Sequence, residues 1–147
     1  MPFVELFVTK GSLDPAQRRQ IGERLVTEVM KAEGAPDTPE ARSISWLVVH
    51  EPSEWWVGGE LTGADDQPRY LVRVSVPAAS LDDAKRADIV ERVTNVLADV
   101  EPDPERLRRS PAAWVHLIEI PEGNWGGGRI VRFKDVMAFV TAGAPTG

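Results

Sequence analysis

An internal repeat with an offset of 68 residues constrains this chain more than any other feature. At that offset residues 12–24 (SLDPAQRRQIGER) align with residues 80–92 (SLDDAKRADIVER), and 8 of the 13 positions are identical. The offset also superimposes two apolar stripes with the spacing i, i+4, i+8: Ile21, Leu25 and Val29 on Ile89, Val93 and Leu97. Because a helix that packs on a sheet needs such a stripe, the repeat predicts two equivalent helices.

Both predicted helices begin with residues typical of helix N-termini. Asp14, Pro15 and Gln17 provide an N-cap, a proline at the first helical position and a capping-box partner. In the second copy, Ser80 with Asp83 is predicted to provide the parallel start. The two helices are thus expected to begin at equivalent places in the repeat.

Runs rich in β-forming residues lie before and after each predicted helix. They occupy residues 3–9, 43–49, 70–76 and 113–120. Each copy is therefore predicted to be a β-α-β unit, the first at residues 1–65 and the second at residues 69–140. The 147 residues are expected to form one domain, with residues 142–147 (AGAPTG) as a flexible tail.

Two β-α-β units with right-handed crossovers predict an α+β fold. The expected architecture is a four-stranded mixed sheet with both helices on one face. Runs such as residues 47–49 (LVV) and 114–120 (WVHLIEI) are too apolar for a sheet face in water. We therefore expect other copies of the chain to cover the second face in a homo-oligomer.

The composition excludes several classes of function. The formal net charge of −6 argues against the broad cationic surface of a nucleic-acid-binding protein. The chain has no cysteine and only two histidines, so neither a thiolate nor an all-histidine metal site is expected, and no cofactor is predicted. No apolar run approaches the ~20 residues of a membrane span, so a soluble, cytoplasmic protein with no membrane partner is expected.

Pro2 follows Met1 directly, and removal of Met1 would leave a secondary amine as the chain terminus. An α-amino group titrates near ~7.7 to 8.0, and burial or neighbouring arginines lower that pKa. Such an amine could act as a general base near neutral pH. The alternative is that Pro2 simply begins an edge strand, where proline is tolerated.

The chain resembles the tautomerase superfamily in residues 2–18 (PFVELFVTKGSLDPAQR), in residues 54–61 (EWWVGGEL) and in the duplication itself. In oxalocrotonate tautomerase the β-α-β subunit opens with a catalytic proline and closes with an aromatic residue before a Gly-Gly-Glu-Leu-like hairpin, which resembles Trp55 or Trp56 before residues 58–61. The two-repeat length is similar to the fused branch, which includes malonate semialdehyde decarboxylase and the cis-chloroacrylate dehalogenases. The resemblance implies a tautomerase-like trimer with Pro2 as the base, or as an acid in hydrating members.

Several arginine and water-activating positions of the family are missing from this chain. Ser12 stands where oxalocrotonate tautomerase has an arginine, and its mid-chain arginine position falls near Ser45. The paired arginines of the dehalogenases and the decarboxylase are replaced by residues 77–80 (PAAS), and their helix histidine and downstream glutamate correspond to Val29 and approximately Gly127. The resemblance therefore does not carry dehalogenation or that decarboxylation over to this chain.

His116 lies in residues 114–121 (WVHLIEIP), which resemble a strand of the dehalogenases that carries a functional tyrosine at this position. A neutral histidine can donate a hydrogen bond, so His116 could polarise a substrate carbonyl. The alternative is a sheet histidine at the oligomer interface.

Three arginines are candidates for binding a substrate carboxylate, because the guanidinium group binds carboxylates through two hydrogen bonds. They are Arg73, Arg42 and Arg129. The alternative for each is a solvated or internally paired side chain. Three further arginines are predicted to form a surface network: Arg106, Arg108 and Arg109.

The glycine-rich segment at residues 122–129 (EGNWGGGR) lacks the Lys-Ser/Thr of a P-loop and precedes a β-like run at residues 130–133. A hairpin that packs against a neighbouring subunit explains it better than a nucleotide site. Asn124 and Trp125 could then cap a pocket between chains, whereas Trp46 and Trp114 are expected in the core or at an interface.

The resemblance implies an isomerase that converts the enol and keto forms of a small 2-oxo or 2-hydroxydienoic acid, and no metal is expected. The catalytic candidates are Pro2 and His116, and the substrate-binding candidates are Arg73, Arg42, Arg129, Trp55, Trp56, Trp125 and Asn124. One alternative is a hydratase, decarboxylase or dehalogenase side activity of the same proline. Another is a non-catalytic trimeric protein that binds ligands or serves as a scaffold.

Overall fold

The computed structural model describes residues 1–63 and 65–142. Its elements in chain order are β1 (Phe3–Val8), α1 (Pro15–Glu33), α2 (Pro39–Ser43), β2 (Trp46–His50), β3 (Trp56–Val57), β4 (Glu60–Leu61), β5 (Tyr70–Pro77), the 3₁₀ helix η1 (Ala78–Ser80), α3 (Asp83–Ala98), α4 (Arg106–Arg109), β6 (Ala113–Ile120) and α5 (Phe133–Thr141). Apart from Ala142, the predicted tail lies outside the described residues.

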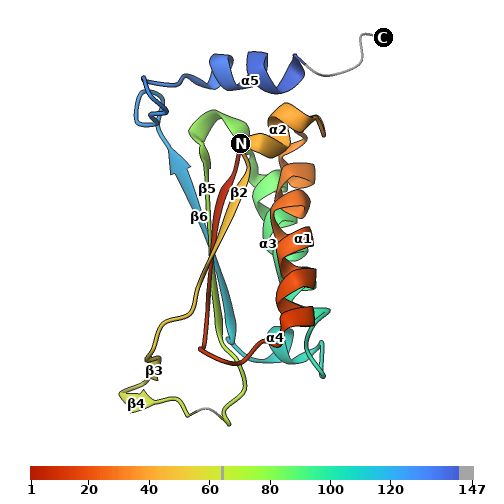
Figure 1. Cartoon of the computed structure of the whole chain (residues 1–147), viewed down its shortest axis with the longest axis vertical. Helices are drawn as coiled ribbons and strands as arrows, with labels where there is room; N and C mark the ends of the chain where they lie inside the picture. The colour runs from red at the N-terminus through yellow and green to blue at the C-terminus, as the bar shows by residue number, and fades with distance from the viewer. Residues whose placement is uncertain (64, 143–147) are drawn as a thin grey trace.

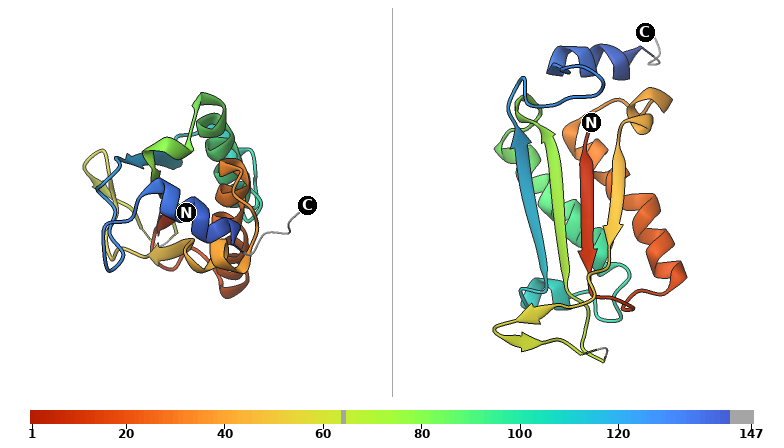
Figure 2. Two further views of the ribbon diagram at one scale, coloured as in Figure 1. Left: turned by 90° about the horizontal axis from the view of Figure 1, so that it is seen from above. Right: turned by 60° about the vertical axis from the view of Figure 1, so that its left-hand side comes forward.

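The predicted α+β architecture is confirmed. The main sheet has four strands in the order β2-β1-β5-β6. Strand β1 is parallel to β2, β5 is parallel to β6, and the central strands β1 and β5 are antiparallel. Helices α1 and α3 lie side by side on one face of this sheet (Figures 1 and 2).

The strand register follows the sequence repeat. Phe3 is opposite Trp46 in the first copy, and Leu71 is opposite Trp114 at the same offset in the second. Where the two copies meet, Glu5 on β1 is opposite Arg73 on β5, and these two residues are themselves equivalent in the repeat. The two units are therefore related by an approximate two-fold axis that passes between β1 and β5.

The main hydrophobic core fills the space between the sheet and the two long helices. Alternate residues of the central strands face the helices and are buried: Val4, Leu6, Val8, Val72, Val74 and Val76. The two apolar helix stripes predicted from the repeat are buried against them. Burial of these side chains is the main stabilising contribution to the fold.

Helix α1 begins with the predicted capping residues, whereas the N-cap of α3 differs from the prediction. Asp14 Oδ1 accepts a hydrogen bond from the Gln17 amide at 2.8 Å, and Gln17 Oε1 accepts one from the Asp14 amide at 2.9 Å. The N-cap of α3 is Asp82, which accepts from the Lys85 amide at 2.8 Å. Ser80 lies in η1 instead, where its hydroxyl donates to the Pro77 carbonyl.

The helix α5 is a feature that the sequence reading missed, because residues 130–133 look β-like. Only Gly126 and Ile130 form a β-bridge there. The Asp135 carboxylate accepts a hydrogen bond from the Arg132 amide at 3.0 Å and so caps the helix that begins at Phe133. In Figures 1 and 2, α5 crosses the end of the sheet where the chain begins.

A second, smaller hydrophobic cluster holds α5 in place. Val136 and Val140 pack with Met30 and Ala41, and the Thr38 hydroxyl donates to the Val140 carbonyl at 2.8 Å. Helix α2 is also new, since its last residue lies in the run expected as strand from residue 43. The strand β2 begins only at Trp46.

No element covers most of the sheet face opposite α1 and α3 (Figure 1), and large apolar side chains on it are exposed in the single chain. Trp46 and Trp114 are 62 % and 58 % exposed. Both are expected from the sequence in the core or at an interface. Neither lies in the core of the single chain, so they remain predicted interface residues.

Arg106 is a further correction, because it is buried rather than part of a surface network. Arg108 and Arg109 do form exposed ion pairs, with Glu91 and Asp103. In the part of the chain that the structure describes, no helix combines the length and apolar character needed to cross a membrane.

Candidate active site at the amino-terminal end of the sheet

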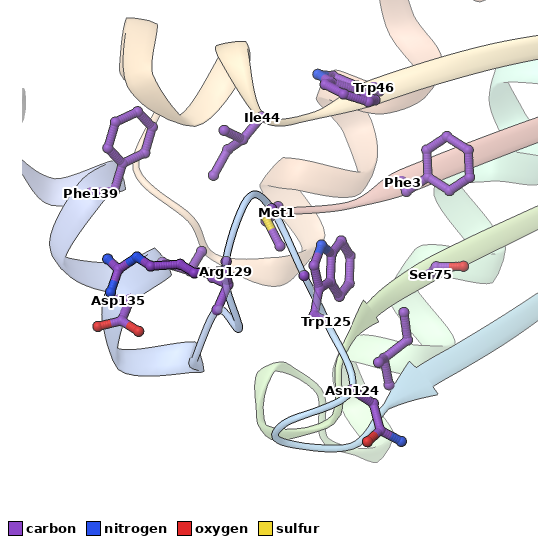
Figure 3. A pocket seen from close by; sticks show the side chains of 15 residues that line it. Met1, Phe3, Ile44, Trp46, Ser75, Asn124, Trp125, Arg129, Asp135 and Phe139 are labelled. Atoms are coloured by element: carbon purple, nitrogen blue, oxygen red, sulfur yellow. The ribbon is translucent and has the colours of Figure 1, made fainter.

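A cavity of about 700 Å³ opens at the end of the sheet where the chain begins. It lies between the start of β1, the loop after β6 and helix α5 (Figure 3). Its lining residues are Met1, Phe3, Ile44, Trp46, Ser75, Ile120, Asn124, Trp125, Gly126, Gly127, Arg129, Val131, Asp135, Val136 and Phe139. The walls are mostly apolar and aromatic, with a few polar groups, as is typical of a small-molecule site.

The amino terminus lies at the base of this cavity. The Met1 amine is 3.4 Å from Glu33 Oε2. Pro2 is buried, and its carbonyl accepts a hydrogen bond from the Trp46 amide at 3.1 Å. While Met1 is present the Pro2 nitrogen belongs to an amide and has no basicity.

Glu33 is a buried carboxylate, with a side chain only 3 % exposed. Its Oε1 atom has no hydrogen-bond partner within the described residues. Burial raises the pKa of the Glu33 carboxyl, and the positive charges of the Met1 amine and Lys85 act in the opposite direction.

Three of the predicted substrate-binding residues line the cavity together with Met1. Asn124 and Trp125 come from the loop after β6, and Arg129 follows its glycine turn (Figure 3). The turn is held by hydrogen bonds from the Gly127 amide to the Arg129 carbonyl and from the Val131 amide to the Trp125 carbonyl, both 2.8 Å long. This backbone pairing holds Trp125 and Arg129 at the cavity, with the Arg129 guanidinium directed toward Asp135 of α5 (Figure 3).

The other two arginine candidates have carboxylate partners outside the cavity. Arg42 Nε is 2.6 Å from Asp37 Oδ1, in an exposed pair that lowers the pKa of the Asp37 carboxyl. Arg73 Nη1 is 3.8 Å from Glu5 Oε2 on the open face of the sheet.

The β3–β4 hairpin lies at the opposite end of the sheet from the cavity (Figure 1). Trp56 begins β3, and Trp55 precedes it. The β3–β4 hairpin turns through Gly58 and Gly59, whose φ angles of 58° and 87° a two-residue turn requires. Within one chain, this hairpin and the cavity are therefore separate.

Structural comparison identifies the fold. A structure of native fused 4-OT matches with a TM-score of 0.70 and 18 % identity, over 90 % of this chain and 96 % of that one. A structure of Pt0534 inactivated by 2-oxo-3-pentynoate matches with a TM-score of 0.69 and 19 % identity, over 90 % and 97 %. This chain has the fused, two-repeat fold of the tautomerase superfamily.

The tautomerase fold also matches N1, a member of the cis-3-chloroacrylic acid dehalogenase family, with a TM-score of 0.66 and 18 % identity over 88 % of this chain and 82 % of that one. No family model and no curated protein matches the sequence. The likeness to these structures is therefore a likeness of fold.

His116 lies on the open face of this tautomerase fold, away from the cavity. It is opposite Arg73 in the sheet and stacks on Trp114 with ring centroids 6.4 Å apart. His50, which the sequence reading did not single out, lies in the same region with Nε2 3.3 Å from Glu5 Oε1. The open face thus carries its own charged cluster among apolar side chains.

Glu33 is the residue of the candidate site that the sequence reading missed. A signal for it exists, because the 68-residue offset places Glu33 on Glu101 and Pro2 on Tyr70. Both carboxylates are buried, and each accepts a hydrogen bond at the start of its own copy, Glu33 from the Met1 amine and Glu101 from the Tyr70 hydroxyl. Among residues 1–63 and 65–142, no cluster of three or more metal-ligating side chains accompanies them.

Proposed function

We propose that this chain is a tautomerase that uses Pro2, after removal of Met1, as a general base. The substrate would be a small 2-oxo or 2-hydroxydienoic acid that interconverts between enol and keto forms. The observation that carries this proposal is the position of the chain terminus at a cavity with aromatic walls and the guanidinium of Arg129.

In the proposed reaction the Pro2 nitrogen takes the proton of the enol hydroxyl and returns it to the β-carbon. The O–H bond and the C=C double bond are lost, and a C=O double bond and a C–H bond form. Arg129 would bind the substrate carboxylate, and Asn124 could donate a hydrogen bond to the carbonyl oxygen. Trp125 and Phe139 would exclude water, which favours the neutral amine.

A relative in fold supports the substrate class. Pt0534 is inactivated by 2-oxo-3-pentynoate, which is a 2-oxo acid. This chain is proposed to take acids of the same class, because its cavity combines one arginine with mostly apolar walls.

We also propose a homotrimer, in which the open sheet face would be buried. A structure of fused 4-OT with the same fold is a symmetric trimer, and exposed Trp46 and Trp114 favour such an assembly here. Other subunits could complete the site with candidates that lie outside the cavity of one chain. These are Arg42, Arg73, His116, Trp55 and Trp56.

The test is ketonisation of the enol of phenylpyruvate by protein that intact-mass analysis shows to begin at Pro2. Pro2→Ala replaces the secondary amine and its rigid ring by a more mobile primary amine, and we expect kcat/KM to fall by about 10²-fold because the base is no longer held in position. Arg129→Ala is expected mainly to raise KM. The matched control is protein that retains Met1, which should be inactive because its Pro2 nitrogen is an amide.

An unchanged rate for Pro2→Ala would reject the proline mechanism. A processed trimer with no activity on enol acids would favour the non-catalytic alternative. Mass analysis of protein from the native host decides whether Met1 is removed there.

A hydratase or decarboxylase reaction of the same proline is the second candidate. The observation in its favour is Glu33, whose carboxylate lies 3.4 Å from the Met1 amine. Beside a Pro2 amine freed by removal of Met1, this carboxylate would stabilise the protonated nitrogen, which can act as an acid. Release of carbon dioxide or a hydration product from an oxo acid would distinguish it from tautomerisation.

A further inference from the structure

Glu33 is an unusual group for a protein interior, because only half of its carboxylate has a partner. The side chain is 3 % exposed, and Oε2 faces the Met1 amine while Oε1 has no hydrogen-bond partner in the described chain. A buried carboxylate with an unpaired oxygen lowers the stability of the fold. Such groups are rare in native proteins, so the presence of this one calls for an explanation.

The second copy shows what a purely structural carboxylate looks like at the equivalent position. Glu101 Oε1 accepts hydrogen bonds from the Tyr70 hydroxyl at 2.8 Å and from Arg106 Nη2 at 2.6 Å. Arg106 Nε donates to Oε2 at 3.3 Å. Both oxygens of Glu101 have partners, so the unfilled capacity of Glu33 is specific to the copy that begins with Pro2.

We propose that Glu33 is the positioning residue of the Pro2 amine: once Met1 is removed, its carboxylate pairs with that amine and stabilises the ammonium group formed during proton transfer. This inference rests on the function proposed above. The geometry supports it, because the Met1 and Pro2 nitrogens are three bonds apart. The Pro2 nitrogen is therefore no more than about 7 Å from Glu33 Oε2.

Removal of Met1 would also connect Glu33 to the cavity. Met1 both lines the cavity and contacts the carboxylate, so it separates the two in the unprocessed chain. In the processed chain the Pro2 amine becomes the cationic group of the terminus. The free Oε1 and the released Oε2 could then both accept hydrogen bonds from its two N–H groups.

Few other charged groups face this pair. Lys85 on α3 is the second cation that acts on Glu33. Across the cavity, the lining carries Arg129 and Asp135. Because Glu33 is nearly inaccessible to solvent, salt would screen its interaction with the amine only weakly.

Glu33 acts through Pro2 and exchanges no proton with the substrate in this scheme. The Pro2 lone pair forms an N–H bond as the enol O–H bond breaks, and the carboxylate stays ionised beside the new ammonium group. The N–H bond then breaks as the β-carbon takes the proton. Glu33 therefore raises the proton affinity of the Pro2 amine and fixes the orientation of its N–H bonds.

The experiment measures the protonation of the terminal amine directly in protein that begins at Pro2. Arylation by 1-fluoro-2,4-dinitrobenzene requires the unprotonated amine, so its pH midpoint at the N-terminus, followed by mass spectrometry, reports the pKa of that amine. Glu33→Gln is expected to lower the midpoint by about one pH unit, the smaller end of the effect of an adjacent opposite charge. The acidic limb of the kcat/KM profile should move by the same amount.

Two variants separate this role from a general effect on the fold. Glu33→Asp keeps the negative charge, so its pH midpoint of arylation is expected to stay close to that of the wild type. Glu101→Gln removes the equivalent carboxylate and is expected to leave the midpoint unchanged in folded protein.

The outcomes distinguish this inference from the proposed function. An unchanged midpoint in Glu33→Gln overturns the role of Glu33, even where activity still depends on Pro2. A lowered midpoint in a protein without tautomerase activity supports the Glu33–Pro2 pair and overturns the proposed function. Retention of Met1 in the native protein overturns both.

Discussion

The two copies of the β-α-β unit bury the same carboxylate and surround it differently. In the second copy Glu101 is closed in by Tyr70 and Arg106, and Arg106 Nη2 also donates to the Pro68 carbonyl at 2.7 Å. In the first copy Glu33 Oε2 pairs with the chain terminus beside the cavity, and Oε1 has no hydrogen-bond partner within the described residues. The buried carboxylate is therefore common to both copies of the repeat, whereas a carboxylate oxygen without a hydrogen-bond partner is found only in the copy at the amino terminus.

The Tyr70 hydroxyl that closes the network of the second copy is a weak acid. Burial first, and then the hydrogen bond to Glu101, raises the pKa of the Tyr70 hydroxyl far above its ordinary value. Tyr70 therefore stays protonated and donates to Glu101 throughout the physiological pH range. A titratable terminal amine stands at the equivalent place in the first copy.

The largest effect is expected from breaking the closed network. Arg106→Ala would leave the Glu101 carboxylate, with a side chain 3 % exposed, without its cationic partner. We expect a loss of about 3–5 kcal/mol in the free energy of unfolding, measured by urea denaturation. A loss below about 1 kcal/mol would show that the network is not structural and that the contrast between the copies is wrong.

A smaller effect is expected from Tyr70→Phe. This variant keeps the ring and removes one hydrogen bond to a charged acceptor, so the unfolding free energy should fall by about 1.5–3 kcal/mol. Thermal denaturation of the two proteins, with the arylation midpoint of the Pro2 amine as a control, would check it. A shift of that midpoint would mean that the two ends of the sheet are coupled.

The smallest effect is a pH dependence at Glu33 in the chain that retains Met1. Its pKa is raised in the folded state by burial, so the folded protein binds a proton more tightly than the unfolded one. Stability is therefore lost as the pH rises from the ordinary glutamate pKa through the raised value. Glu33→Gln removes this loss, so the unfolding free energy of the variant relative to the wild type should rise across that window.

Unfolding measurements from pH 4 to pH 7 would test this dependence. An unchanged difference between the two proteins over that range would contradict the raised pKa of Glu33. Glu101→Gln serves as the comparison from the other copy.

The sheet and the two long helices could be predicted because the repeat records their spacing twice. The apolar stripes that include Ile21 and Ile89 become the buried faces of α1 and α3. Helix α5 could not be predicted in the same way. It has only nine residues, and contacts of Val136 and Val140 with distant residues hold it in place.

The candidate site was predictable in part, for a related reason. The glycine turn keeps Asn124, Trp125 and Arg129 close together in sequence, so one local structure brings all three to the cavity. Burial of Glu33 and Arg106 depends on partners 32 and 5 residues away and runs against the usual exposure of charged side chains. The sequence repeat shows that Glu33 and Glu101 correspond, but their partners are visible only in three dimensions.

The contact between Glu5 and Arg73 shows what joining two units in one chain makes available. These residues occupy equivalent places in the repeat and lie opposite each other where the units meet. A pair of separate, identical units would bring two copies of one residue together there, and two like charges would repel each other. Duplication within a single gene removes that restriction, because each copy can then mutate independently at the junction and at its own end of the sheet.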